Sequence, residues 1–178
     1  MKVQEQYEIN EAEIAKSLME LFKIKEFNIY CNNVDYAPID MEFDHQSGKK
    51  YIAEIKCRQE MKLGMMIEQK KLIELINSAK KGIEARYINY VESTDQLIIY
   101  DINSRWNLEF LKIWEFPEYP AYYEKIKAQK SEANKERKYK NVMYLYYNHF
   151  QTKDYVIDNF SKTLENNNIQ FNYKKITR

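Results

Sequence analysis

The apolar and polar residues of this chain follow two periods, which separate predicted strands from predicted helices. Residues 39–44 alternate apolar and acidic side chains, the period of a strand with one solvated face. Residues 51–57 are largely apolar and β-prone, which predicts a partly buried strand. Apolar residues at helical spacing predict one helix that starts at Asn10 and a second over about 65–80. Gly82 is expected to end the second helix in the left-handed conformation.

The first predicted helix has a recognisable start. Asn10 is a favoured N-cap residue, and Glu13 stands three positions later, as in a capping box. Four residues form its apolar stripe: Ile14, Leu18, Leu21 and Phe22. Glu11 falls inside this stripe, where an acid either needs a partner or lies exposed in the first turn of the helix. Both interpretations of Glu11 remain open.

The two strands at 39–44 and 51–57 are expected to form a β-hairpin. A three-residue loop would place Gly48 in the left-handed conformation that such hairpins need. This register sets Asp40 opposite Glu54, with Lys56 on the same face, whereas a loop one residue shorter would put Asp40 on the other face. Two opposed carboxylates repel, and a bound cation would relieve that repulsion. The alternative is a charged hairpin face with ordinary cross-strand pairs.

The remaining elements complete a recognisable order. Shorter β-like runs at 27–31, 86–91 and 96–101 give the order helix, three strands, helix, strand, with further strand material afterwards. This order is typical of an α/β sandwich with a mixed sheet. The sequence contains no Gly-rich phosphate loop and no internal repeat, which argues against a P-loop nucleotide-binding protein.

Composition narrows the picture further. With 178 residues the chain is expected to form one domain, 1–178. Its net charge of +1 does not by itself indicate a nucleic-acid partner, so any basic surface must be local. Two cysteines without metal spacing are typical of a reducing compartment. No apolar run approaches the length of a membrane span, so no membrane partner and a cytoplasmic location are expected.

The second half of the chain carries one strongly basic segment, 125–140. Its cations are Lys125, Lys127, Lys130, Lys135, Arg137, Lys138 and Lys140. It is interpreted either as an arm that follows a phosphate backbone or as a solvated helix or loop. Residues 141–147 read as a buried strand that could extend the sheet, and 154–166 as a helix.

Taken together, the residues resemble a known family. Asp40 on the second predicted strand and Glu54-Ile55-Lys56 on the third resemble the PD-(D/E)xK nuclease superfamily, in its phage-type or resolvase-like branches. The triplet Glu-x-Lys recurs elsewhere in the chain, and this copy is singled out by its strand setting. The resemblance covers about residues 8–101 and implies a restriction-endonuclease-like αβββαβ core, followed by a C-terminal extension over 102–178.

The resemblance also implies roles for particular residues. Asp40 and Glu54 would be ligands of Mg²⁺ or Mn²⁺, with the backbone carbonyl of Ile55 as a third ligand. Lys56 would orient the attacking water and contact the phosphate. Glu11 stands at the family's helix-glutamate position, since Ala15 and Leu18 follow at the family spacing, and it would be a further metal ligand.

The expected substrate contacts lie outside the hairpin. On the second helix Lys71 matches the family position that places a Lys or Gln beside the site, and Gln69 is the alternative. In the basic segment the expected contacts are Lys135, Arg137 and Lys138.

The sequence therefore predicts a metal-dependent deoxyribonuclease. Phosphodiester hydrolysis needs a cation that neutralises phosphate charge and lowers the pKa of a water, and carboxylates suit such a cation. The alternative is a non-catalytic module of the same fold that binds nucleic acid or a protein. DNA or RNA as substrate, the mode of cleavage and a homo-oligomeric state stay open.

Overall fold

The computed structural model describes residues 3–30, 39–61, 64–105, 124–128, 138–145 and 153–175. The helices in this part are α1 (Val3–Leu21), α2 (Gln69–Lys80), α3 (Ile102–Arg105) and α5 (Phe160–Asn166). The strands are β1 (Phe27–Ile29), β2 (Met41–Asp44), β3 (Lys50–Arg58), β4 (Met65–Glu68), β5 (Glu84–Val91), β6 (Gln96–Asp101), β7 (Glu124–Ala128), β8 (Lys138–Leu145) and β9 (Tyr155–Ile157).

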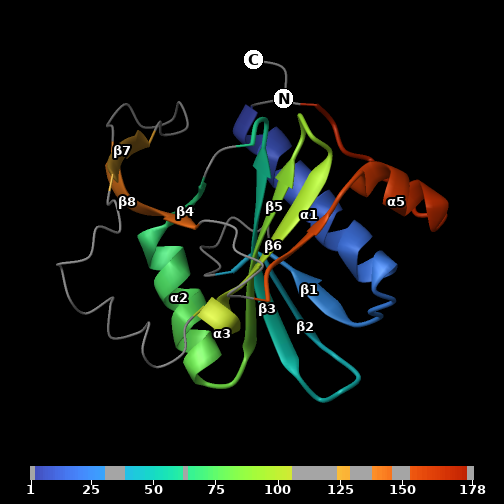
Figure 1. Ribbon diagram of the computed structural model, residues 1–178, viewed down its shortest axis with the longest axis horizontal. Coiled ribbons are helices and arrows are strands. Elements are labelled where there is room, and N and C mark those ends of the chain that lie inside the picture. The colour runs from blue at the N-terminus through green and yellow to red at the C-terminus, as the bar shows by residue number, and fades with distance from the viewer. Residues whose placement is uncertain are drawn as a thin grey trace.

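A mixed sheet of six strands forms the centre of the fold (Figure 1). The strand order is β1-β2-β3-β5-β6-β9, in which β3 and β5 pair in parallel and the other neighbours pair antiparallel. Strands β4, β8 and β7 form a separate antiparallel sheet of three strands. The predicted α/β class with a mixed sheet is confirmed. Of the strand expected at 141–147, residues 141–145 belong to β8, which pairs with β4 and β7 instead of extending the central sheet, and the last two residues lie outside the described part of the chain.

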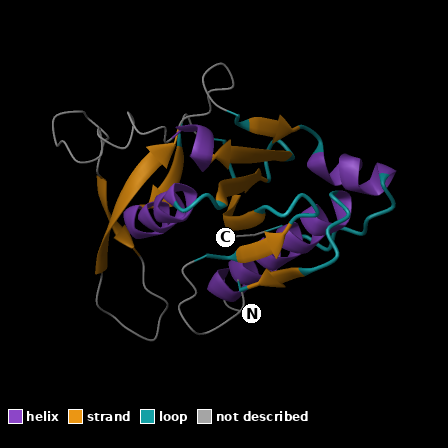
Figure 2. Cartoon of the chain, turned by 90° about the horizontal axis from the view of Figure 1, so that it is seen from below, coloured by secondary structure: helices purple, strands orange, loops and turns teal. Residues whose placement is uncertain are grey.

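Helices cover both faces of the central sheet (Figure 2). On one face α1 and α5 enclose a core that includes Ile14, Leu18 and Ile55. On the other face α2 encloses a second core that includes Leu72 and Tyr87. Because side chains alternate along a strand, Ile55 belongs to the α1 core while its neighbours on β3 face α2. The site described below is built on this alternation.

The predicted hairpin register is confirmed. Met41 pairs with Ala53 and Asp44 with Lys50. The turn is closed by a hydrogen bond from the Gly48 amide to the His45 carbonyl, 2.8 Å long, and Gly48 has φ of +77°. A side chain at this φ would be strained, so glycine fixes the loop and, through it, the register.

The predicted start of the first helix is wrong. Helix α1 begins at Val3, so Asn10 is an interior residue with no exposed surface. Its side chain is used for a tertiary contact, since Nδ2 donates to the Lys174 carbonyl at 2.8 Å. Glu13 accepts a bond from the Asn172 amide instead of closing a capping box. Phe22, expected in the apolar stripe, is 47% exposed because the helix ends at the residue before it.

Two other predicted helix boundaries are corrected by strand pairing. Residues Met65–Glu68 form β4, which pairs with β8, and α2 starts only at Gln69. Gly82 follows the helix with φ of +83°, as expected. The helix expected over 154–166 is divided into β9, which pairs with β6, and the shorter α5.

Candidate active site

The candidate site lies where β3 continues beyond the end of β2. The ladder between the two strands ends at Met41 and Ala53, whereas β3 runs on to Arg58. Asp40 Oδ2 accepts the amide hydrogen of Ile55 at 2.8 Å, so the aspartate side chain takes the place of a strand neighbour. This bond fixes Asp40 at the edge of β3.

Five charged side chains meet at this point, from α1, β3, α2 and the residue directly before β2. The Lys56 Nζ atom lies 3.0 Å from Glu54 Oε1, 3.3 Å from Glu11 Oε2 and 3.4 Å from Asp40 Oδ2. The Lys71 Nζ atom of α2 lies 2.9 Å from Glu54 Oε2. All three acids are buried: Glu54 is 2% exposed, Glu11 8% and Asp40 9%. Lys56 is therefore the common partner of three carboxylates that come from separate parts of the sequence.

Burial and neighbouring charges shift the pKa values of this cluster in opposite directions. Loss of solvent raises the pKa of Glu11 to about 7, although the nearby Lys56 charge acts in the opposite direction. Burial also raises the pKa of Glu54, again against the attraction of Lys56. Burial would lower the pKa of Lys56, but the charges of Glu11, Glu54 and Asp40 outweigh it and hold that pKa well above its ordinary value. Lys56 is therefore an ammonium ion at neutral pH.

Glu11 is expected to make the stability of the protein depend on pH. Because its pKa is raised from 4.5 to about 7 on folding, its favourable contribution is complete below pH 4.5 and is lost as the pH rises through 7. One proton corresponds to about 1.4 kcal/mol of unfolding free energy per pH unit. In urea unfolding measured between pH 4.5 and 8, the unfolding free energy of Glu11→Gln should fall less steeply with pH than that of the wild type, by up to this amount.

The matched control for this measurement is Glu20→Gln, which alters an exposed acid on the same helix. Its side chain is 45% exposed and forms a surface pair with Lys16, so its stability curve should run parallel to that of the wild type. A Glu11→Gln curve that also runs parallel would contradict the assigned titration of Glu11.

The donor chemistry of the cluster fits a hard divalent cation. Carboxylate oxygens are the ligands that Mg²⁺ and Mn²⁺ prefer, and three carboxylates against two ammonium groups leave one negative charge when all are ionised. Within the described residues no three His, Cys, Asp or Glu side chains form a ready-made metal-ligand group. The carboxylates gather on the Lys56 ammonium instead, so a cation would have to take over contacts that Lys56 now makes.

The fold brings together most of the residues expected from the sequence. Glu11, Asp40, Glu54, Lys56 and Lys71 meet in one cluster. Glu11 is partnered and buried, which decides between its two interpretations. The other expected residues are placed differently.

On the second helix, Gln69 is the first residue of α2 and partly buried, and the helix reaches the cluster through Lys71. Lys135 and Arg137 lie outside the described residues, as does most of the basic segment. Lys138 begins β8, and its side chain is outside the described part.

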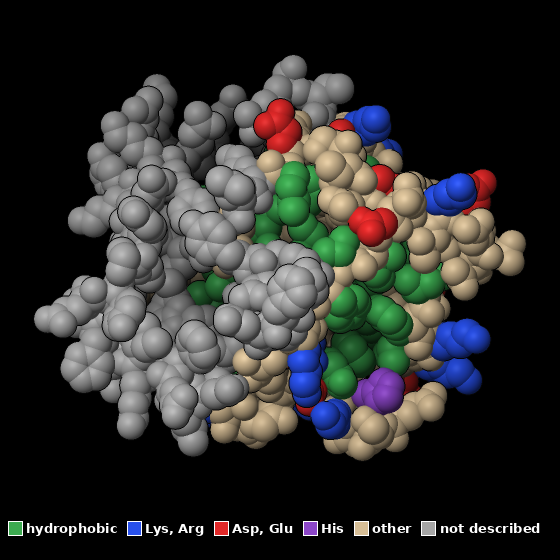
Figure 3. Space-filling model, viewed as in Figure 1, with side chains coloured by type: hydrophobic (Ala, Val, Ile, Leu, Met, Phe, Trp, Pro, Cys, Tyr) green, Lys and Arg blue, Asp and Glu red, His purple; other side chains and the backbone are tan. Residues whose placement is uncertain are grey.

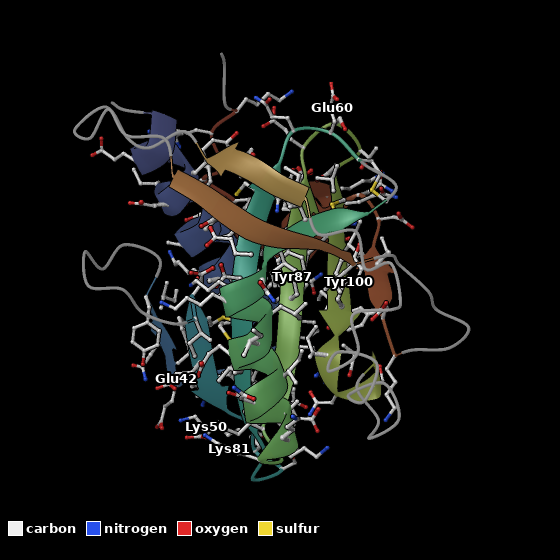
Figure 4. The ribbon with its side chains drawn as sticks, turned by 90° about the vertical axis from the view of Figure 1, so that its left-hand side faces the viewer. Glu42, Lys50, Glu60, Lys81, Tyr87 and Tyr100 are labelled. Atoms are coloured by element: carbon white, nitrogen blue, oxygen red, sulfur yellow. The ribbon has the colours of Figure 1, made fainter. Side chains whose placement is uncertain are left out.

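Sequence reasoning missed a polar network next to the cluster. Arg58 Nη2 donates to the Tyr87 hydroxyl at 2.9 Å and to the Met66 carbonyl, and Arg58 Nε donates to Asn89 Oδ1 at 3.3 Å. Figure 4 places Tyr87 where α2 meets the smaller sheet. Alternation along β3 puts Arg58 on the face of Lys56, and this spacing is the signal that could have identified it.

Comparison with known proteins adds no identification. No protein-family model, no curated protein and no solved structure matches the chain. Among the helices that the structure describes, none has both the length and the apolar character needed to cross a bilayer.

Proposed function

We propose that this chain is a divalent-metal-dependent nuclease that hydrolyses phosphodiester bonds in DNA. The observation that carries the proposal is the convergence of Glu11, Asp40 and Glu54 on Lys56, three buried acids around one ammonium. Burying like charges together destabilises a fold, and such clusters occur most often where charge has a function. The proposal takes its reaction class from the motif at Asp40 and Glu54-Ile55-Lys56 and from the order α1-β1-β2-β3-α2-β5, in which β4 is inserted before α2.

Each residue has a distinct role in this proposal. Asp40, Glu54 and Glu11 would hold Mg²⁺ or Mn²⁺, together with the Ile55 carbonyl. The bound cation would supply charge neutralisation at the phosphate and a water of lowered pKa. Lys56 is protonated, so it donates hydrogen bonds to the attacking water and to the phosphate and does not act as the general base.

Lys71 has a supporting role. Its ammonium pairs with the Glu54 oxygen that Lys56 does not contact. This pairing holds the Glu54 carboxylate in one orientation. It also offsets part of the negative charge of the cluster before a phosphate enters.

The test is cleavage of linear, circular and branched DNA, and of RNA, in Mg²⁺, Mn²⁺ or EDTA. We expect DNA cleavage only with the metal, and its loss in Asp40→Asn, in which the bond to the Ile55 amide can persist while the charge is removed. The matched control is Asp44→Asn at the other end of the adjoining strand β2, an exposed acid that pairs in register with Lys50. Cleavage that survives in Asp40→Asn would refute the assigned site.

A non-catalytic module of the same fold is the second candidate. The observation in its favour is that Lys56 already contacts all three acids, so the cluster can serve as a buried ion-pair network without metal. DNA binding that is sensitive to salt and independent of metal, without cleavage of any substrate, would favour this candidate.

A further inference from the structure

Arg58 and Arg86 are both partly buried in the central sheet, but they have different partners. Arg86 forms ion pairs with Glu84 and Asp101, each at 2.9 Å. Arg58 is partly buried, and its hydrogen-bond acceptors among the described residues are a carbonyl, a hydroxyl and an amide oxygen, all of them neutral. Burial would lower the pKa of Arg58, but neighbouring groups, the Glu11 carboxylate among them, raise it, and no hydrogen bond joins Glu11 to Arg58 within the described part of the chain. A guanidinium whose hydrogen bonds go to neutral acceptors can still bind an anion.

Asn89 provides a second polar group at the same place. It is completely buried, and within the described residues its Nδ2 atom has no hydrogen-bond partner. The β3–β5 register pairs Asn89 with Lys56, so both side chains lie on the same face of the sheet. A buried donor without an acceptor destabilises the fold, and such groups commonly meet a ligand or an ordered water.

We infer that Arg58, held in place by Tyr87 and Asn89, binds a phosphate group of the nucleic-acid substrate beside the bond that is cleaved at Lys56. The inference rests on the proposed function, and it adds a substrate-binding residue that the motif does not contain. Toward the described residues Arg58 uses Nε and Nη2, and in this inference Nη1 meets the phosphate oxygen. Asn89 Nδ2 would supply a second donor to the same anion.

The geometry favours arginine at this position. A guanidinium can be tethered by some of its N–H groups while others stay directed at an anion, whereas a lysine ammonium provides a single point of charge. The Tyr87 hydroxyl also donates to the Met66 carbonyl, which ties the Arg58 network to β4. Because β4 leads directly into α2, which carries Lys71, the network connects the phosphate contact to the carboxylate cluster.

The test is the salt dependence of DNA binding in EDTA, measured by fluorescence anisotropy of a labelled 12-base-pair duplex for the wild type, Arg58→Met and Arg86→Met. The logarithm of the DNA-binding constant falls linearly with the logarithm of the salt concentration, and loss of one phosphate contact should make this fall less steep by about 0.9. We expect this reduction and roughly tenfold weaker binding in Arg58→Met. Arg86→Met should lower stability, because it removes the Arg86 ion pair of Asp101 and leaves Glu84 with Lys49 alone. It should leave the salt slope unchanged, because Arg86 is not expected to contact a phosphate.

Asn89→Asp keeps the proposal testable if Arg58→Met does not fold. The new carboxylate would hold Arg58 by an ion pair and cancel its charge, so duplex binding should weaken while the thermal midpoint is maintained. If the folded Arg58→Met and Asn89→Asp variants bind DNA with unchanged affinity and unchanged salt dependence, the inference is overturned. Arg58 would then have only a structural role, through its hydrogen bond to the Met66 carbonyl of β4.

The two proposals fail in distinguishable ways. A wild type that cleaves DNA, with binding unaffected by Arg58→Met, refutes the phosphate contact alone. A wild type that binds the duplex through Arg58 and never cleaves it refutes the nuclease and leaves the phosphate contact standing. A wild type that does not bind the duplex overturns both.

Discussion

Replacing Lys56 by methionine is expected to destabilise the protein by about 3–5 kcal/mol at pH 8, the scale for leaving buried charges without their partner. The replacement is nearly the same size, so the lost interaction is the ammonium with Glu11, Asp40 and Glu54. For a chain of this size such a loss lowers the thermal midpoint by roughly 10 °C. Thermal and urea unfolding of the purified variant measure it directly.

The destabilisation should shrink as the pH falls. Without Lys56 the carboxyl pKa values of Glu11 and Glu54 in the folded state rise further above their unfolded values. A group with a raised folded pKa contributes least above that pKa and most below its unfolded value, so the deficit of Lys56→Met is largest above pH 7 and smallest near pH 4.5. A deficit that does not change with pH would show that the lost interaction is packing.

Divalent cations provide the decisive comparison for this variant. If the acids form a metal site, Mg²⁺ or Mn²⁺ should raise the thermal midpoint of Lys56→Met more than that of the wild type, since the competing ammonium is gone. The control is Lys49→Met, whose exposed side chain pairs with Glu84 away from the cluster and should cost about 0–1 kcal/mol. If Mg²⁺ and Mn²⁺ change the thermal midpoint of neither the wild type nor Lys56→Met, the result would favour the buried ion-pair network.

Glu54→Gln is expected to lower the rate of metal-dependent DNA cleavage by about 10³-fold, corresponding to about 4 kcal/mol of lost transition-state stabilisation. The substitution keeps the size of the side chain and removes the charge that would hold the metal. The variant should fold, because the raised pKa of Glu54 means that folding does not favour its ionised form. Single-turnover cleavage with excess enzyme separates this effect from DNA binding.

The matched control for Glu54→Gln is Glu84→Gln. Glu84 lies on the neighbouring strand β5 and also pairs with two cations, Lys49 and Arg86. Its replacement should lower stability modestly, because its partner Lys49 is exposed. The cleavage rate should stay within about twofold of the wild type, because Glu84 pairs in register with Tyr51, away from the cluster. Equal loss of cleavage in both variants would trace the defect to stability, and full activity in Glu54→Gln would remove Glu54 from the site.

Local sequence signals were sufficient for the hairpin that carries the site. The alternation over 39–44 and the glycine at 48 predicted a register that the structure confirms. Because the side-chain period of a strand is two, this register places Asp40 beside Glu54 and turns Lys56 to the same face. Glu11 was identified by its place in the apolar stripe of its helix.

Local signals failed where distant segments compete for the same residues. Asn10 has the chemistry of an N-cap, yet it bonds to the backbone of Lys174, 164 positions away, inside a longer helix. Met65 fits the helical stripe of apolar residues expected over 65–80, yet residues 65–68 form a strand that pairs with β8. Hydrophobic periodicity contains no information about such partners.

The sequence by itself determined the α/β class, the hairpin register and the identity of the three acids and the lysine that could form a site. Only the tertiary structure decided that Glu11 is buried against Lys56, that Lys71 contacts Glu54, and that Arg58 is held by Tyr87 and Asn89. The physical reason is the range of the interactions. Turn chemistry and side-chain alternation act over a few residues, whereas the burial and charge pairing of the site depend on segments that only the folded chain brings together.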